Sequence, residues 1–97
     1  MNEFFSSLAS RWRDAASRRG ANIQAPALDA AVAEEILQLA RVVAHSKERS
    51  FAPLASFTAG VAAERLRVAK GGDADPAMIA AYVREVREAL EGESPAV

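Results

Sequence analysis

The stretch ARVVAHSKERSFAPL gathers three cations and the only histidine of the chain. Arg41 and His45 stand one helical turn apart, and Lys47 and Arg49 follow directly. Pro53 then favours a helix start, where free backbone N–H groups attract anions. Arg41, His45, Lys47 and Arg49 are therefore candidate ligands for a phosphate or a carboxylate.

The same residues also fit a structural corner between two helices. Cations near the C-terminus of a helix interact with its dipole and hydrogen-bond its last carbonyls without any ligand. On this interpretation Arg49 caps the preceding helix or pairs with Glu34 or Glu64. We favour the structural corner and keep the anion site as the alternative.

Catalytic and metal-binding chemistry find little support in the sequence. The absence of cysteine excludes thiolate nucleophiles and cysteine-ligated zinc. The carboxylates Glu34, Glu35 and Glu64 lack the paired Glu-x-x-His motifs by which helical bundles bind metals. No nucleophile-elbow signature surrounds a serine. We therefore expect a non-enzymatic protein with no catalytic residue, no cofactor and no metal.

Length and charge limit the class of protein further. A chain of 97 residues fits one domain, 1–97, and alanine supplies much of its 51% hydrophobic content. A net charge of −1 gives no global field that would attract nucleic acid or an anionic membrane. No apolar run approaches the roughly 20 residues of a membrane span. We expect a cytoplasmic protein with no membrane contact, and nucleic acid is an unlikely partner.

Apolar periodicity, interrupted by proline and glycine, predicts an all-α fold. The architecture expected is a small four-helix bundle or an orthogonal helical domain. The predicted helices lie near residues 2–19, 27–46, 53–70 and 75–91, with a frayed tail at 92–97.

The first two predicted helices are amphipathic. Trp12 shares a face with Phe5 and Leu8, which places its ring in the core. The second helix is apolar over most of its circumference, as is typical of a central helix. Its remaining face carries one polar strip, formed by Glu34, Gln38, Arg41 and His45.

The third and fourth predicted helices add expectations about packing and capping. Leu54 and Phe57 are expected to face inward. Gly60 lies in mid-helix among alanines, which predicts a close helix crossing. Asp75 followed by Pro76 is typical of an N-cap and a first helical residue.

Part of the sequence resembles a small uncharacterised bacterial domain that occurs alone or fused behind molybdenum-cofactor guanylyltransferases. The resemblance implies an accessory or interaction role in the biosynthesis of that cofactor. The chain has no glycine-rich nucleotide loop after a strand and no βα alternation, so guanylyl transfer is not its own activity. The matching residues are Leu39, Ala40, Arg41, Val43, Ala44, His45, Arg49, Ala52, Pro53, Leu54, Phe57, Gly60 and Ala62.

The leading hypothesis is a module that binds a protein partner or a second copy of itself. Candidate interface residues are Phe4, Val42, Phe51 and Tyr82. The first alternative is the anion site described above. A helix-turn-helix DNA binder is less favoured, because the third helix has few side chains that reach base edges.

Overall fold

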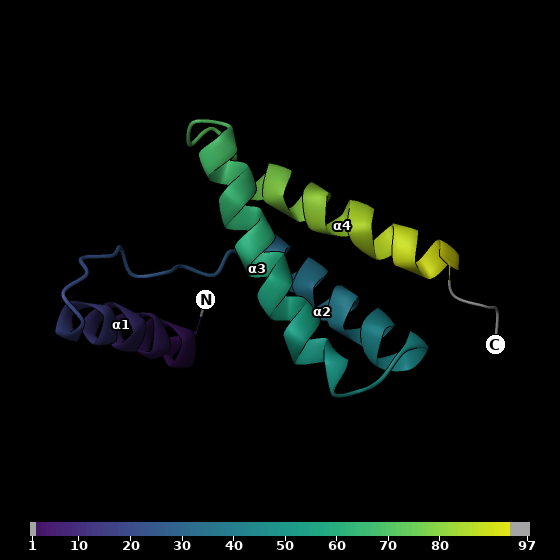
Figure 1. Ribbon diagram of the computed structural model, residues 1–97, viewed down its shortest axis with the longest axis horizontal. Helices are drawn as coiled ribbons and strands as arrows, with labels where there is room; N and C mark the ends of the chain where they lie inside the picture. The colour runs from purple at the N-terminus through teal and green to yellow at the C-terminus, as the bar shows by residue number, and fades with distance from the viewer. Residues whose placement is uncertain (1, 94–97) are drawn as a thin grey trace. The chain divides into compact units, whose positions relative to one another are not determined.

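The computed structural model describes residues 2–93. Within that range the chain forms α-helices and no β-strand, which confirms the predicted all-α class. Its internal contacts divide it between Ala30 and Ala31 into two compact units, which are described separately. None of the described helices is both long and apolar enough to cross a bilayer. The helices are α1 (Glu3–Arg18), α2 (Ala30–Ser46), α3 (Phe51–Ala69) and α4 (Pro76–Glu93) (Figure 1).

The observed helix ends lie within three residues of the predicted ones. The start of α3 differs from the prediction for a local reason. The helix begins at Phe51, two residues before Pro53. The N–H groups of Phe51 and Ala52 donate to the carbonyls of Glu48 and Arg49 at 3.0 and 3.2 Å, so the loop winds directly into the helix. The predicted frayed tail lies outside the described residues, apart from its first two positions, which belong to α4.

Side-chain caps and glycines define several helix ends. The carboxylate of Asp75 accepts from the N–H of Met78 at 2.8 Å, and Pro76 is the first residue of α4, as predicted. Asn2 caps α1 in the same way, through the N–H of Phe5. Gly20 ends α1 with a φ of 78°, a left-handed conformation that favours glycine.

The first unit contains α1 and the connector that follows it. Phe5, Leu8 and Trp12 lie against Pro26 and Leu28 of that connector around a shallow hollow. No residue of α1 is buried, and Trp12 is 57% exposed. The prediction of a core tryptophan is therefore wrong, because a single helix with an extended connector offers too little surface to enclose an indole ring.

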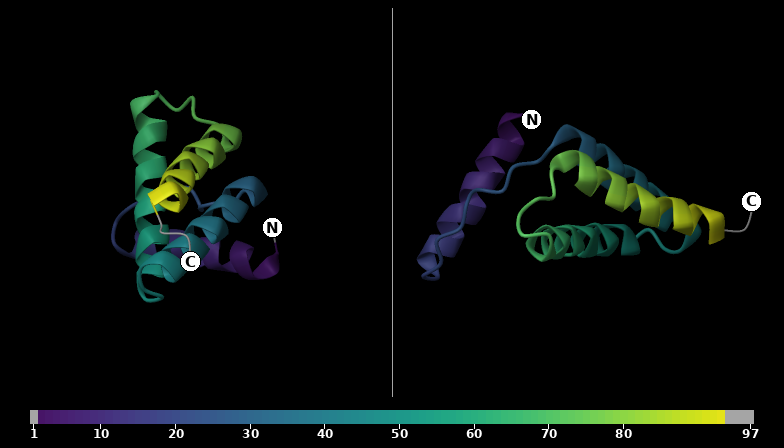
Figure 2. Two further views of the ribbon diagram at one scale, coloured as in Figure 1. Left: turned by 90° about the vertical axis from the view of Figure 1, so that its right-hand side faces the viewer. Right: turned by 90° about the horizontal axis from the view of Figure 1, so that it is seen from above.

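The second unit contains α2, α3 and α4. In both views of Figure 2, α3 crosses α2 and α4, which run alongside each other. The buried apolar residues are few and come from two helices, Leu39 and Val43 of α2 and Ala80 and Val83 of α4. The residues packed around them are Ile36, Ala55, Ala59 and Leu90.

Helix α2 is less enclosed than its composition predicts. Leu37 is 61% exposed, so the expectation of a helix buried on several sides is wrong. The physical reason is that α3 and α4 cover only the side on which Leu39 and Val43 lie. The predicted polar strip is present, since Gln38 donates to Glu34 at 2.9 Å.

Gly60 does not mark a helix crossing. It is exposed, and a Cβ atom added to it would meet nothing within 4 Å. The alanines beside it, Ala55 and Ala59, pack against the core instead. The close packing predicted for this helix is therefore made by Ala55 and Ala59, not by Gly60.

Replacing Gly60 by alanine is expected to stabilise the protein. The methyl group meets no neighbour, and the unfolded chain loses conformational freedom, which together contribute about 0.5–1 kcal/mol to the free energy of unfolding. Urea unfolding of Gly60→Ala provides the measurement. The control is Gly71→Ala, which is expected to destabilise because Gly71 has a φ of 65°. A loss of stability in Gly60→Ala would contradict the open face.

Removing the Asp75 cap is expected to destabilise α4. Asp75→Ala leaves the N–H of Met78 without its acceptor, at a cost of about 1 kcal/mol in the free energy of unfolding. Asp73→Ala is the matched control, because the Asp73 carboxylate caps no helix. Equal midpoints for the two variants in urea would show that the cap contributes nothing.

Candidate functional site

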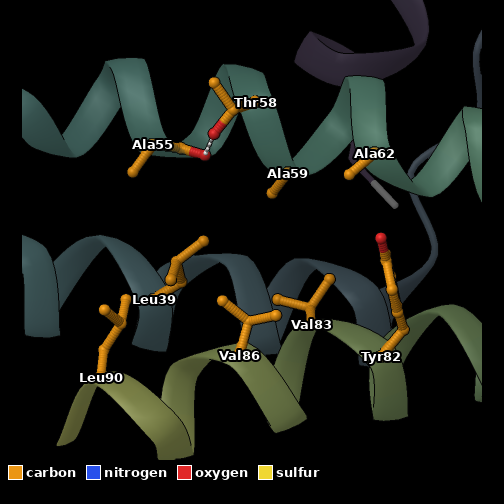
Figure 3. A pocket seen from close by; sticks show the side chains of 9 residues that line it. All are labelled: Leu39, Ala55, Thr58, Ala59, Ala62, Tyr82, Val83, Val86 and Leu90. Carbon is orange, nitrogen blue, oxygen red and sulfur yellow. Dashed lines mark hydrogen bonds between the residues drawn. The ribbon is translucent and has the colours of Figure 1, made fainter. Parts of the chain in front are cut away.

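An open groove of about 250 Å³ lies between α3 and α4, with α2 beneath it (Figure 3). Its lining is almost entirely apolar. Its lining residues are Leu39, Ala55, Thr58, Ala59, Ala62, Tyr82, Val83, Val86 and Leu90. We refer to it as the α3–α4 groove.

The groove exists because α3 presents mainly methyl groups to its neighbours along this stretch. Ala55, Ala59 and Ala62 recur at steps of four and three residues and lie on one side of the helix, facing α4 in Figure 3. The larger side chains of Val86 and Leu90 approach from α4 without filling the space. The Thr58 hydroxyl donates to the Ala55 carbonyl at 2.8 Å, so its proton is already hydrogen-bonded within α3.

A second hollow continues the groove along α3. It shares Thr58, Ala62 and Tyr82 with the first and extends to Leu66 and Arg65. The Tyr82 ring therefore lies where the two hollows meet. Among residues 2–93, no ion pair or hydrogen bond engages the Arg65 guanidinium, which makes it the cation nearest the groove that is free for a partner.

A second side of α3 is also apolar, and its Phe57 and Val61 line the second hollow with Tyr82. We call this the outer stripe; its residues, at steps of three, four and seven, are Leu54, Phe57, Val61 and Val68. Leu54 is 63% exposed and Phe57 72% exposed, so the expectation that both face inward is wrong. The alanine side packs inward because methyl groups let the backbone of α3 approach its neighbours, and the large side chains are left outside.

The buried charge of the second unit was not anticipated. Glu35 is 8% exposed, and its carboxylate accepts from Nε of Arg84 at 2.9 Å and from Nε of Arg87 at 3.2 Å. Arg87 also pairs with Glu91 at 2.7 Å. One signal was available, because Glu35 precedes Leu39 by one turn and so lies on the apolar side of α2.

This ion cluster joins α2 to α4 and is electrically balanced. The hydrogen bond from Arg84, with that from Arg87, holds the pKa of Glu35 below its usual range although burial acts in the opposite direction. A carboxylate held ionised by two arginines is a poor general acid or base. We therefore interpret the cluster as a structural link between two helices.

The corner at residues 41–55 is arranged differently from the predicted anion site. Arg41, His45, Lys47 and Arg49 are all exposed, and Arg41 donates to Gln38 at 2.9 Å. The free N–H groups expected at a helix start by Pro53 are not available, since the N–H groups of Phe51 and Ala52 donate to loop carbonyls and Pro53 has none. An anion there would be held by side chains alone.

The acidic partners expected for Arg49 are engaged elsewhere. Glu64 pairs with Arg67 of the same helix at 2.6 Å, and Glu34 accepts from Gln38. Within the part of the chain that the structure describes, the Arg49 side chain makes no ion pair or hydrogen bond. Its suggested capping role is thus not observed.

The four predicted interface residues come from both units and from four different helices. Phe4 belongs to the first unit and the other three to the second. Tyr82 is half-buried in the α3–α4 groove, Phe51 is exposed at the start of α3, and Val42 is half-buried on α2. The sequence reasoning named Tyr82 as a candidate interface residue but predicted neither the groove nor the outer stripe.

The chain matches one known protein family over nearly its whole length. Residues 5–96 match the family described as Domain of unknown function (DUF6457). The chain belongs to this family. The match includes the α3–α4 groove, the outer stripe and the ion cluster, so all three lie inside the family's domain. No curated protein and no solved structure matched the chain in the corresponding searches.

Replacing Glu35 is expected to destabilise the protein at neutral pH and to reduce its sensitivity to acid. Because the folded state lowers the pKa of Glu35, its contribution is present above the usual pKa of a glutamic acid, about 4.3, and is lost as the pH falls below it. Glu35→Gln removes the charge that holds Arg84 and Arg87, so its unfolding midpoint should start lower and fall less on acidification.

The matched control for that experiment is Glu34→Gln. Glu34 adjoins Glu35 in the sequence but is exposed and accepts only from Gln38. Its urea midpoint should follow the wild type between neutral and acidic pH. Identical pH profiles for wild type and Glu35→Gln would show that the cluster does not stabilise the fold.

Proposed function

We propose that the protein is a non-enzymatic protein-interaction module whose contact surface consists of the α3–α4 groove and the outer stripe. The observation that carries this proposal is the exposure of Leu54, Phe57 and Val68 on one face of α3. A run of large apolar side chains left in water marks a site of association.

The shape of the surface indicates the kind of partner. A groove between two helices beside an apolar ridge fits an amphipathic helix of another protein, whose apolar residues recur at helical spacing. The polar groups nearest the groove are the Tyr82 hydroxyl and the guanidinium of Arg65. An acidic side chain at the edge of the partner helix would pair with Arg65.

A binding role also fits the charges of the second unit. Its buried carboxylate, Glu35, is neutralised by two arginines, and Glu64 and Glu91 are paired as well. These groups have structural partners and do not converge on the groove. The proposal therefore assigns the protein no reaction of its own.

The resemblance to a domain fused behind molybdenum-cofactor guanylyltransferases supplies a candidate partner. In a fused protein the two domains stay together through the covalent link, whereas a separate chain needs a surface that holds them together. We propose that the partner is an enzyme of molybdenum-cofactor biosynthesis. Calorimetric titration of this chain with the guanylyltransferase of the same organism tests the link.

The binding experiment compares variants of exposed residues. Phe57→Ser is expected to weaken partner binding by about 30-fold or more, as for a hot-spot residue, with little change in the unfolding midpoint. Leu37→Ser, also at a residue more than half exposed but on α2, is the matched control and should bind like wild type. Equal affinities for all three proteins would overturn the proposed surface.

The anion-binding alternative is tested by measuring the melting temperature in the presence of phosphate. Phosphate at increasing concentration should not change the melting temperature if the protein-binding proposal is correct. A phosphate-dependent rise in the wild type that is lost in Arg49→Ala would favour the site formed by Arg41, His45, Lys47 and Arg49.

A further inference from the structure

Helix α1 keeps part of its apolar face exposed beside the connector, and the proposed function does not use this part. Phe4 is 65% exposed and Trp12 57% exposed, and the half-buried Leu8 lies between them, one turn from each. The Phe4 ring packs edge-on against Phe5, at a centroid distance of 5.0 Å, which makes one end of the face a pair of aromatic rings. The connector adds Ile23, which is 41% exposed.

The charges of α1 lie along the borders of this face. Arg11 and Arg18 follow Phe4 at steps of seven residues and therefore lie on one border, while Arg13 lies on the other. Glu3 and Asp14 lie on the opposite, serine-rich side, with Ser10. The helix thus has an apolar face, a cationic border and a polar back.

The cations on the main border are available to a ligand. Arg13 is within 3.4 Å of Asp14, and Arg19 donates to the Ala15 carbonyl. In contrast, no ion pair or hydrogen bond within residues 2–93 engages the guanidinium groups of Arg11 and Arg18. From Asn2 to Gly20 four arginines stand against two carboxylates, so this segment is locally cationic although the whole chain has a net charge of −1.

We propose that α1 binds the surface of an anionic lipid bilayer. Phe4, Leu8 and Trp12 would enter the interface between headgroups and acyl chains, where aromatic side chains are favoured. The guanidinium groups of Arg11 and Arg18 would reach lipid phosphates from the border of the same face. The expectation of no membrane contact rested on the net charge of the whole chain and on the absence of a span, and neither describes a helix that lies in the interface.

The arrangement favours a lipid surface over nucleic acid. A nucleic-acid site would place its cations at the centre of the contact face, whereas here the centre is apolar and the cations border it. A bilayer also accepts an apolar face of any detailed shape, which suits two exposed aromatic residues two turns apart. Charge complementarity with anionic headgroups then supplies the specificity.

Tryptophan fluorescence reports on α1 alone, because Trp12 is the only tryptophan of the chain. Its fluorescence is measured for the full chain with vesicles of phosphatidylcholine, with and without phosphatidylserine. The expected result is a blue shift of the emission with phosphatidylserine vesicles that weakens as salt is added. Sedimentation with the same vesicles measures the bound fraction independently.

Two pairs of variants separate the apolar from the charged contribution. The double variant Arg11→Gln, Arg18→Gln should lower the apparent affinity for phosphatidylserine vesicles by about tenfold or more, whereas Lys70→Gln, at an exposed cation after α3, should leave it unchanged. Phe4→Ser should weaken binding, and Phe51→Ser on α3 should not. Circular dichroism confirms that the variants keep their helical content.

Several outcomes would overturn the proposal. An emission spectrum that vesicles do not change would exclude the lipid contact. A spectrum already blue-shifted without vesicles and unaffected by them would place the Trp12 ring in a protein contact. A shift that depends on protein concentration alone would assign the face to a second copy of the chain. Binding that is equal in both vesicle types would remove the role of Arg11 and Arg18.

Discussion

The inward face of α3 is made of methyl groups, and this constraint determines how the second unit is built. Ala55 and Ala59 let α3 lie close to its neighbours but cannot fill the space beside Val83, which leaves the α3–α4 groove. The large apolar side chains of α3, Leu54 and Phe57, are consequently in water. The small core of the second unit and the exposed apolar surface of α3 therefore have the same cause: the small side chains of α3 face inward and the large ones face water.

This distribution connects stability to association. Removing apolar surface from water contributes roughly 25 cal/mol per Å², and a fold with few buried residues obtains little of it internally. The outer stripe and the groove hold apolar surface that α2, α3 and α4 leave exposed. A partner that covered this surface would add to the stability of the folded chain, because ligands that bind only the folded state stabilise it.

The elements were predictable from the sequence to the extent that they depend on local chemistry. Asp75 before Pro76 marked the start of α4, and Gly20 marked the end of α1, because caps and left-handed glycines act over a few residues. The faces of the helices were less predictable. Trp12 and Phe57 were assigned to the core on periodicity, but periodicity shows which residues share a face and not which neighbour is present to cover them.

The ion cluster was missed for a related reason. Glu35 lies on the apolar side of α2, one turn before Leu39, but its burial and its partners depend on the position of α4. Arg84 and Arg87 are about fifty residues away, so no local pattern links them to α2. Tyr82 was named only as a candidate interface residue, and the α3–α4 groove that it lines depends on the packing of three helices.

The balance of charge around Glu35 also restricts how this protein family can change. Losing the carboxylate alone leaves Arg84 without its partner and the largely buried Arg87 paired only with Glu91, and losing Arg87 alone leaves a buried carboxylate less well compensated. Replacing all of the charged residues by apolar ones of similar volume avoids both penalties. Evolutionary paths should therefore pass through relatives that keep Glu35 together with Arg84 and Arg87, or that have exchanged all three, and single-exchange intermediates should be short-lived.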